Sequence, residues 1–243
     1  MDKYARQTTI QMGMSVSRMN QFRKTAANAA SEMADLGLEA GVVGKMQAAY
    51  AEQTGRQVML TREASVAMAE TARITGMEVE ELAGMTGEME AFGLGVKQSA
   101  AMVLDMSKEA ASMGLNSSKV IKSFQSNLGL LNKLNFKNGV DGLKKMAQYS
   151  EKFKIDMQDV ASVADKVFRP EGAIEAAAQL QVLGGSLAAM GDPFQLMYKA
   201  RNSPEELAKS LSKAVTASAT FNSTTKEYEV NAYELDRLRE TAQ

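Results

Sequence analysis

The sequence has no cysteine and no histidine. Without these residue types it cannot form disulfide bonds, Ser-His-Asp triads, Cys-His dyads or ordinary zinc sites. Carboxylates, lysine or tyrosine could still support catalysis, so these absences make an enzyme less expected without excluding one. We therefore expect a protein that is not an enzyme and that uses no metal or other cofactor.

Long apolar runs and an excess of one charge are also missing. No stretch of about 20 apolar residues, the length of a membrane-spanning helix, occurs in the sequence. The nearest candidate, Ala173 to Gly191, has Glu175 as its only charge, and we expect a buried core helix there, with membrane insertion left open. The 28 basic and 29 acidic residues nearly cancel, which does not favour specific recognition of nucleic acid.

What the sequence does contain is typical of a globular helical protein. Hydrophobic residues make up 45% of the chain and charged residues 23%, which is enough apolar surface for a core. Methionine is abundant, with 18 residues. Two interpretations stay open: methionine fills irregular gaps between helices, or it forms an adaptable surface that binds partners.

The three prolines predict helix starts. Ser203-Pro204-Glu205-Glu206 matches a capping box with proline at the first helical position, and Asp192-Pro193 repeats that arrangement with aspartate as the cap. Pro170 should open a third helix, whose apolar positions are Ile174, Leu180, Leu183, Leu187 and Met190.

Glycines predict where helices end. Gly37, Gly76, Gly93 and Gly114 each follow an alanine-rich stretch and precede an apolar residue, the pattern of a left-handed helix terminus. The interval from Leu134 to Gly142 contains two asparagines and two glycines and reads as a loop.

Apolar spacing supports an all-α fold, a multi-helix bundle of short antiparallel helices. Ile121, Phe124, Leu128 and Leu131 are separated by 3, 4 and 3 residues, the spacing of a helix–helix seam. These four residues are our candidates for an interaction site with copies of the same chain.

The chain divides into three predicted segments. Residues 1–36 should form a partly exposed helical arm and residues 37–220 the helical bundle domain. In residues 221–243, β-branched and aromatic residues around 220–230 predict a small β-hairpin, followed by a helix. That helix reaches Gln243 without a cap, so we expect it to continue in a longer parent chain.

Clusters of like charge have ordinary structural interpretations. The acidic residues between Glu78 and Glu90 should lie near a helix start, where negative charge is favourable. The basic residues Lys144, Lys145, Lys152 and Lys154 should form a solvated helix face, because no aromatic array accompanies them. Gly93-Leu94-Gly95 lacks the third glycine and the preceding strand of a dinucleotide-binding motif.

Three segments together resemble the helical region of phage tail tape-measure proteins. They are the helix–glycine–helix series from Ala72 to Val120, the run AAAQLQVLGGSLAAMGDPF from Ala176 to Phe194, and the hairpin-then-helix pattern from Phe221 to Arg239. These segments cover roughly two-thirds of the chain with alanine- and glycine-rich patterns of low specificity. No catalytic residue is implied by the resemblance.

The resemblance implies a structural virion protein. Tape-measure proteins lie inside the tail tube, help to set tail length and leave with the DNA at infection. The implied partners are copies of the chain and tail proteins of the tube, baseplate or tip, with membrane contact during delivery left open. The implied locations are the tail interior and, during assembly, the host cytoplasm. The alternative is a cellular helical adaptor or secreted effector domain with a methionine-rich binding face.

Overall fold

The computed structural model describes residues 10, 13, 15–35, 39, 41–56, 58–183, 188, 190–217, 219–222 and 227–230. Within these residues it contains eleven α-helices, one short 3-10 helix and two short strands. The chain divides into two compact units, Met1–Ile121 (unit 1) and Lys122–Gln243 (unit 2). The all-α class and the multi-helix bundle arrangement are thereby confirmed.

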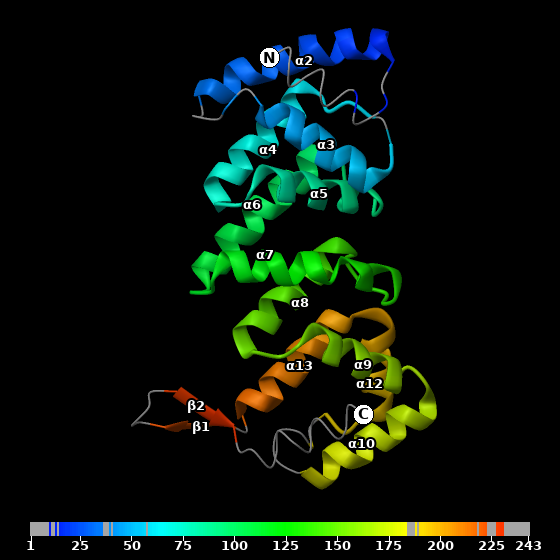
Figure 1. Ribbon diagram of the computed structural model, residues 1–243. Coiled ribbons are helices and arrows are strands. Elements are labelled where there is room, and N and C mark those ends of the chain that lie inside the picture. The colour runs from blue at the N-terminus through cyan, green and yellow to red at the C-terminus, as the bar shows by residue number, and fades with distance from the viewer. Residues whose placement is uncertain are drawn as a thin grey trace. The chain divides into compact units, whose positions relative to one another are not determined.

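The described part of unit 1 contains five complete helices, which Figure 1 labels. They are α2 (Val16–Asp35), α3 (Val42–Thr54), α4 (Arg62–Thr75), α5 (Val79–Glu90) and α6 (Val96–Ser112). Helix α3 packs on α5, and α4 packs on α6. The largest fully buried side chains described in this unit are mostly methionines: Met46, Met68, Leu82, Met85, Met89, Met106 and Ile121.

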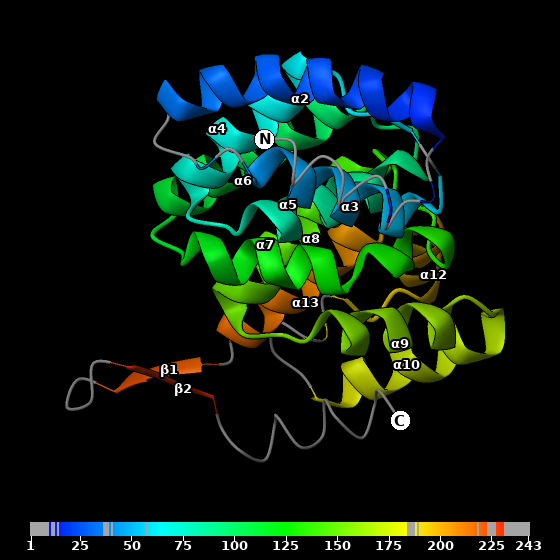
Figure 2. The same cartoon turned by 45° about the horizontal axis from the view of Figure 1, so that its top comes forward.

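Helix α2 lies on the outside of unit 1, along α3 and α4 (Figure 2). Phe22, Ala26, Ala29 and Ala30 follow helical spacing and are buried, while many of its other described side chains are exposed. Within the predicted arm, the described helix α2 is therefore half-buried in unit 1 along one apolar stripe.

Helix α7 (Ser117–Ser126) contains the boundary between the two units. At its start the Ser117 hydroxyl donates to the Ser107 carbonyl oxygen at 2.9 Å, and in its second half the Ser123 hydroxyl donates to the Met157 sulfur at 3.3 Å. The boundary thus falls inside the segment 37–220 that we expected to be one domain. Glycine and proline mark helix ends, and neither marks a boundary that falls inside a helix.

Unit 2 continues with η1 (Leu128–Asn132), α8 (Val140–Phe153), α9 (Met157–Val167), α10 (Pro170–Leu183), α12 (Pro193–Asn202) and α13 (Pro204–Ala217). Helix α13 packs on α8, while α9, α10 and α12 pack on one another in pairs. Core side chains include Leu143, Met146, Val160, Val167, Leu180, Leu196 and Leu207. The predicted loop at 134–142 is confirmed up to Gly139, after which α8 begins.

Two strands follow α13. They are β1 (Ala219–Asn222) and β2 (Glu227–Val230), which pair antiparallel with Phe221 opposite Tyr228. The connecting residues 223–226 lie outside the described residues, so the hairpin as a folded unit stays a prediction. The predicted terminal helix and the stop at Gly37 also lie outside them.

The predicted helix ends are largely confirmed. Gly76, Gly93 and Gly114 all have positive φ, as a left-handed terminus requires. The Asp192 carboxylate accepts from the backbone N–H groups of Phe194 and Gln195 at 2.9 and 3.3 Å, which caps α12.

Helix α13 does begin at Pro204, as predicted. The capping box predicted at Ser203 is wrong in one hydrogen bond, the one from the Ser203 backbone N–H to the Glu206 side chain. The box needs Glu206 to accept from the Ser203 backbone N–H, but that N–H donates to the Lys199 carbonyl oxygen at 2.8 Å. The physical reason is that a single residue separates α12 from α13, so its N–H completes the earlier helix.

No helix in the described ranges is long and apolar enough to cross a membrane. Helix α10, which covers most of the described part of Ala173 to Gly191, buries Ala173, Ala176, Ala177 and Leu180. The expectation of a core helix is met on that side, whereas Ile174 points to solvent with 61% of its surface exposed.

Exchanging Gly76 for alanine should destabilise unit 1 by about 1 kcal/mol, because an alanine with positive φ crowds its Cβ against the backbone. Space is not the cause, since a Cβ there meets nothing within 4 Å. Gly84→Ala is the matched control: Gly84 lies inside α5 with equally open space, and this change should stabilise by roughly 0.5–1 kcal/mol. Urea denaturation measures both, and a loss for Gly84→Ala as large as for Gly76→Ala would contradict this explanation.

Candidate interaction surface

Among the described residues each unit exposes four large apolar side chains, and the four of unit 2 lie on helices that pack together. Phe168, Ile174, Phe194 and Tyr198 are exposed by 51%, 61%, 76% and 66%, and they lie at the end of α9, on α10 and on α12. Single exposed apolar residues are common on proteins, whereas several on helices that pack together indicate an interaction surface. We call these four residues with Arg201 the aromatic surface.

Helix α12 presents its aromatic residues because of how its two faces are divided. Leu196 and Ala200 are buried, and Phe194 and Tyr198, also four residues apart, lie on the opposite side. Asp192 and Pro193 fix the start of the helix and therefore the direction in which each face points.

Arg201 joins α12 to the end of α9. Its Nε and Nη2 atoms donate to the Phe168 carbonyl oxygen at 3.1 and 2.7 Å, and its guanidinium lies 4.7 Å from the centre of the Phe168 ring. The cation–π contact and the two hydrogen bonds hold a positive charge beside exposed aromatic rings.

The predicted interaction residues have a different environment. Ile121, Phe124 and Leu128 are buried, and Leu131 is half-buried, so they pack within the chain and three of the four are inaccessible to a second copy. Helical spacing identifies an apolar face but not what covers it. A face buried inside the chain and a face that binds a second copy therefore have the same sequence pattern. Self-association of the chain stays a prediction.

Half of the methionines whose burial is described lie in the core, and six more are half-buried. Seven methionines are buried: Met46, Met68, Met85, Met89, Met106, Met146 and Met157. In the described part of the chain, the exposed large apolar side chains include one methionine, Met113. Of the two interpretations of methionine, gap filling between helices matches this distribution.

The acidic cluster is divided between the two ends of α5, whereas we expected it near a helix start. Glu80 and Glu81 do lie in the first turn, and Glu80 lies 3.0 Å from the Lys45 ammonium of α3. At the other end Glu90 accepts a short hydrogen bond from the Tyr50 hydroxyl and lies 3.3 Å from Arg56. Burial and this bond raise the pKa of Tyr50, so the phenol stays protonated and ties α3 to α5.

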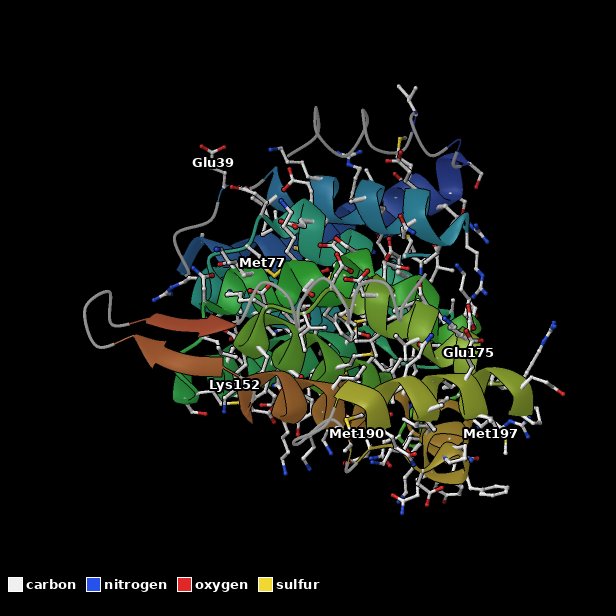
Figure 3. The ribbon with its side chains drawn as sticks, turned by 90° about the horizontal axis from the view of Figure 1, so that it is seen from below. Glu39, Met77, Lys152, Glu175, Met190 and Met197 are labelled. Atoms are coloured by element: carbon white, nitrogen blue, oxygen red, sulfur yellow. The ribbon has the colours of Figure 1, made fainter. Side chains whose placement is uncertain are left out.

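The basic cluster on α8 does not form one exposed patch. Lys144 is buried, with its ammonium 4.0 Å from Asp141, while Lys154 lies 3.2 Å from Glu151. Lys152, labelled in Figure 3, lies over the Phe153 ring with its ammonium 5.5 Å from the ring centre. These separate contacts fit a helix face better than a site for nucleic acid.

Glu205 is the one glutamate buried among the described residues, with 5% of its surface exposed. One carboxylate oxygen, Oε2, has no hydrogen-bond partner. Burial raises the pKa of Glu205, as does the neighbouring Glu206, whereas its own backbone N–H, Lys145 and Lys137 oppose the rise. The carboxyl lies against Gly142 of α8, so this group belongs to the α8–α13 packing.

Within the described ranges no group of three or more acidic side chains could hold a metal ion. No protein-family model, no curated protein and no solved structure matches the chain. The aromatic surface is therefore the feature that best suggests a function.

Only a weak signal in the sequence pointed to this surface. Phe194 and Tyr198 are four residues apart, but Leu196 and Ala200 are too, and spacing alone does not say which pair is buried. The pairing of Phe168 with Arg201 joins residues 33 apart and depends on how α12 packs on α9.

Replacing Leu128 by aspartate should cost at least about 3 kcal/mol of unfolding free energy, because a carboxylate would enter a buried position without a partner. Leu131→Asp is the control within the same seam and should cost less than about half as much, since Leu131 is only half-buried. Equal effects in urea denaturation would contradict the assignment of Leu128 to the core.

Glu205→Gln should stabilise the protein at pH 7 by about 1 kcal/mol, because it removes a charge from a buried position. The raised pKa means that the folded chain holds this proton to higher pH than the unfolded chain, so the carboxyl favours folding at low pH and opposes it above the folded pKa. The stabilisation by Glu205→Gln should therefore be smaller at pH 4 than at pH 7.

Urea denaturation at pH 7 and pH 4 measures the unfolding free energy of the original chain and of the Glu205→Gln variant. Glu206→Gln is the neighbouring control, because Glu206 is exposed and 3.7 Å from Lys209, and its effect should be within about 0.5 kcal/mol. A Glu205→Gln gain that is equal at both pH values would show that the charge is not the cause.

Proposed function

We propose that this chain is a structural protein of a phage tail, of the tape-measure class, which packs against copies of itself and against other tail proteins. The observation that carries the proposal is the aromatic surface, which a helical scaffold leaves uncovered. Such a surface suits a protein that acts by contact with other proteins. The resemblance of the three sequence segments supplies the tail as the setting.

Within a tail the chain has the features of an assembly or delivery domain rather than of the ruler. As one continuous helix, 243 residues would extend about 365 Å at 1.5 Å per residue. The longest described helix, α2, has 20 residues, and the helices fold back on one another within each unit. The measuring rod would then be encoded elsewhere in a longer gene.

The chain would reside in the tail interior after assembly in the host cytoplasm, and would act without catalysis or cofactors. The alternative is a cellular adaptor or secreted effector domain with a methionine-rich face. That alternative is less well supported, because Met113 is the one exposed methionine among the residues whose burial is described.

Deleting about 40 residues from this chain in the phage that encodes it should abolish tail assembly or infectivity, because the deletion removes whole helices from a packed unit. The matched deletion removes about 40 residues from the presumed rod and should give viable tails that are shorter by about 60 Å. Electron microscopy of the particles measures both lengths.

Two results would contradict the proposal. Tails that shorten in proportion when this chain is cut would make it part of the ruler. Purified tails that lack the chain, by mass spectrometry, would exclude it from the virion and favour the adaptor.

A further inference from the structure

The outer sides of α10 and α12 carry apolar side chains together with charges of opposite sign. The outer side of α10 has Ile174 between Glu171 and Glu175, which are its only charged residues. Helix α12 has Phe194 and Tyr198, and its only charged residues are Lys199 and Arg201. One helix is therefore acidic and the other basic, and both expose large apolar groups.

The two helices that carry these outer sides are neighbours. Helix α10 packs on α12, and both pack on α9. The residues that each helix buries, Ala173, Ala177 and Leu180 on α10 and Leu196 and Ala200 on α12, lie opposite the exposed ones. Figure 3 labels Glu175 on α10 and Met197 on α12 in this part of unit 2.

The positive charge on this face is already held in position. Arg201 stacks on Phe168 and donates two hydrogen bonds to its carbonyl oxygen, whereas the Lys199 ammonium is held against α13, where it donates to the Ser210 hydroxyl at 2.8 Å. Side chains that are ordered before binding lose less entropy when a partner arrives.

We infer that this face binds the same face of a second copy in a two-fold contact, with α10 of each chain on α12 of the other. In a two-fold contact the same patch is used twice, so it has to be complementary to itself. Placing α10 on α12 sets Glu171 and Glu175 against Lys199 and Arg201 at both ends, with the apolar side chains between them. Placing α10 on α10 would set carboxylates against each other.

This inference rests on the proposed packing of the chain against itself and specifies the surface. The contact has only a few apolar groups, so we expect a dimer with a dissociation constant on the order of tens of micromolar. Because charges take part, raising the salt concentration should weaken it.

The test uses two charge reversals, Glu175→Lys and Arg201→Glu, in the full chain. Each variant alone sets like charges against each other twice per dimer, and sedimentation equilibrium should show dimerisation weakened by more than about tenfold. Mixing the two variants in equal amounts restores opposite charges at both contacts, because one contact is reversed and the other is unchanged. The mixture should therefore dimerise about as well as the original chain.

Phe194→Ser provides a second disruption that does not touch the Arg201 hydrogen bonds, and it should also weaken the dimer. Ile74→Ser is the matched control, because Ile74 on α4 is 62% exposed but lies in unit 1, and it should leave association unchanged. Circular dichroism establishes that every variant is folded before its mass is compared.

Three results would overturn the inference. They are an original chain that stays monomeric up to about 100 µM, a dimer that tolerates both reversals and Phe194→Ser, and a mixture that fails to associate although each single variant is folded. A monomer would leave the tail-length experiment untouched, since binding to another tail protein would still allow the proposed function.

Discussion

Short helices that cannot stand alone are the constraint on which this structure depends. The described helices have between 10 and 20 residues, and isolated helices below about 12–15 residues are marginal in water. Each helix must therefore bury an apolar face against a neighbour. The core of unit 1 meets this need with flexible methionine side chains such as Met46, Met85 and Met106, which fit the irregular spaces where short helices cross.

The same constraint explains why exposed apolar groups carry information here. A chain that relies on burial for every helix would gain further stability from covering Phe194 and Tyr198, yet both remain on the surface. Their helix carries only positive charges and packs beside α10, a helix that carries only negative ones. Composition cannot reveal this separation, because the charges of the whole chain nearly cancel.

Local features were predictable from the sequence because their physics is local. The positive φ of Gly76 and the helix start at Pro193 follow from single residues and their neighbours. The seam residue Leu128 was recognised as apolar and helical, but which surface covers it depends on residues far along the chain. The Ser203 capping box failed for a related reason, since the preceding helix competed for the same N–H group. The aromatic surface needed the packing of α9, α10 and α12, which no spacing rule contains.

The single residue between α12 and α13 has a mechanical consequence. Ser203 donates its N–H to the last turn of α12, and its carbonyl oxygen accepts from Glu206 and Leu207 at the start of α13, at 2.8 and 3.2 Å. The next residue is Pro204, whose ring fixes φ and restricts Ser203 as well. Hydrogen bonds on both sides of Ser203 and the proline that follows it therefore restrict the angle between α12 and α13. Because α13 also packs on α8, this joint connects α12 to α8.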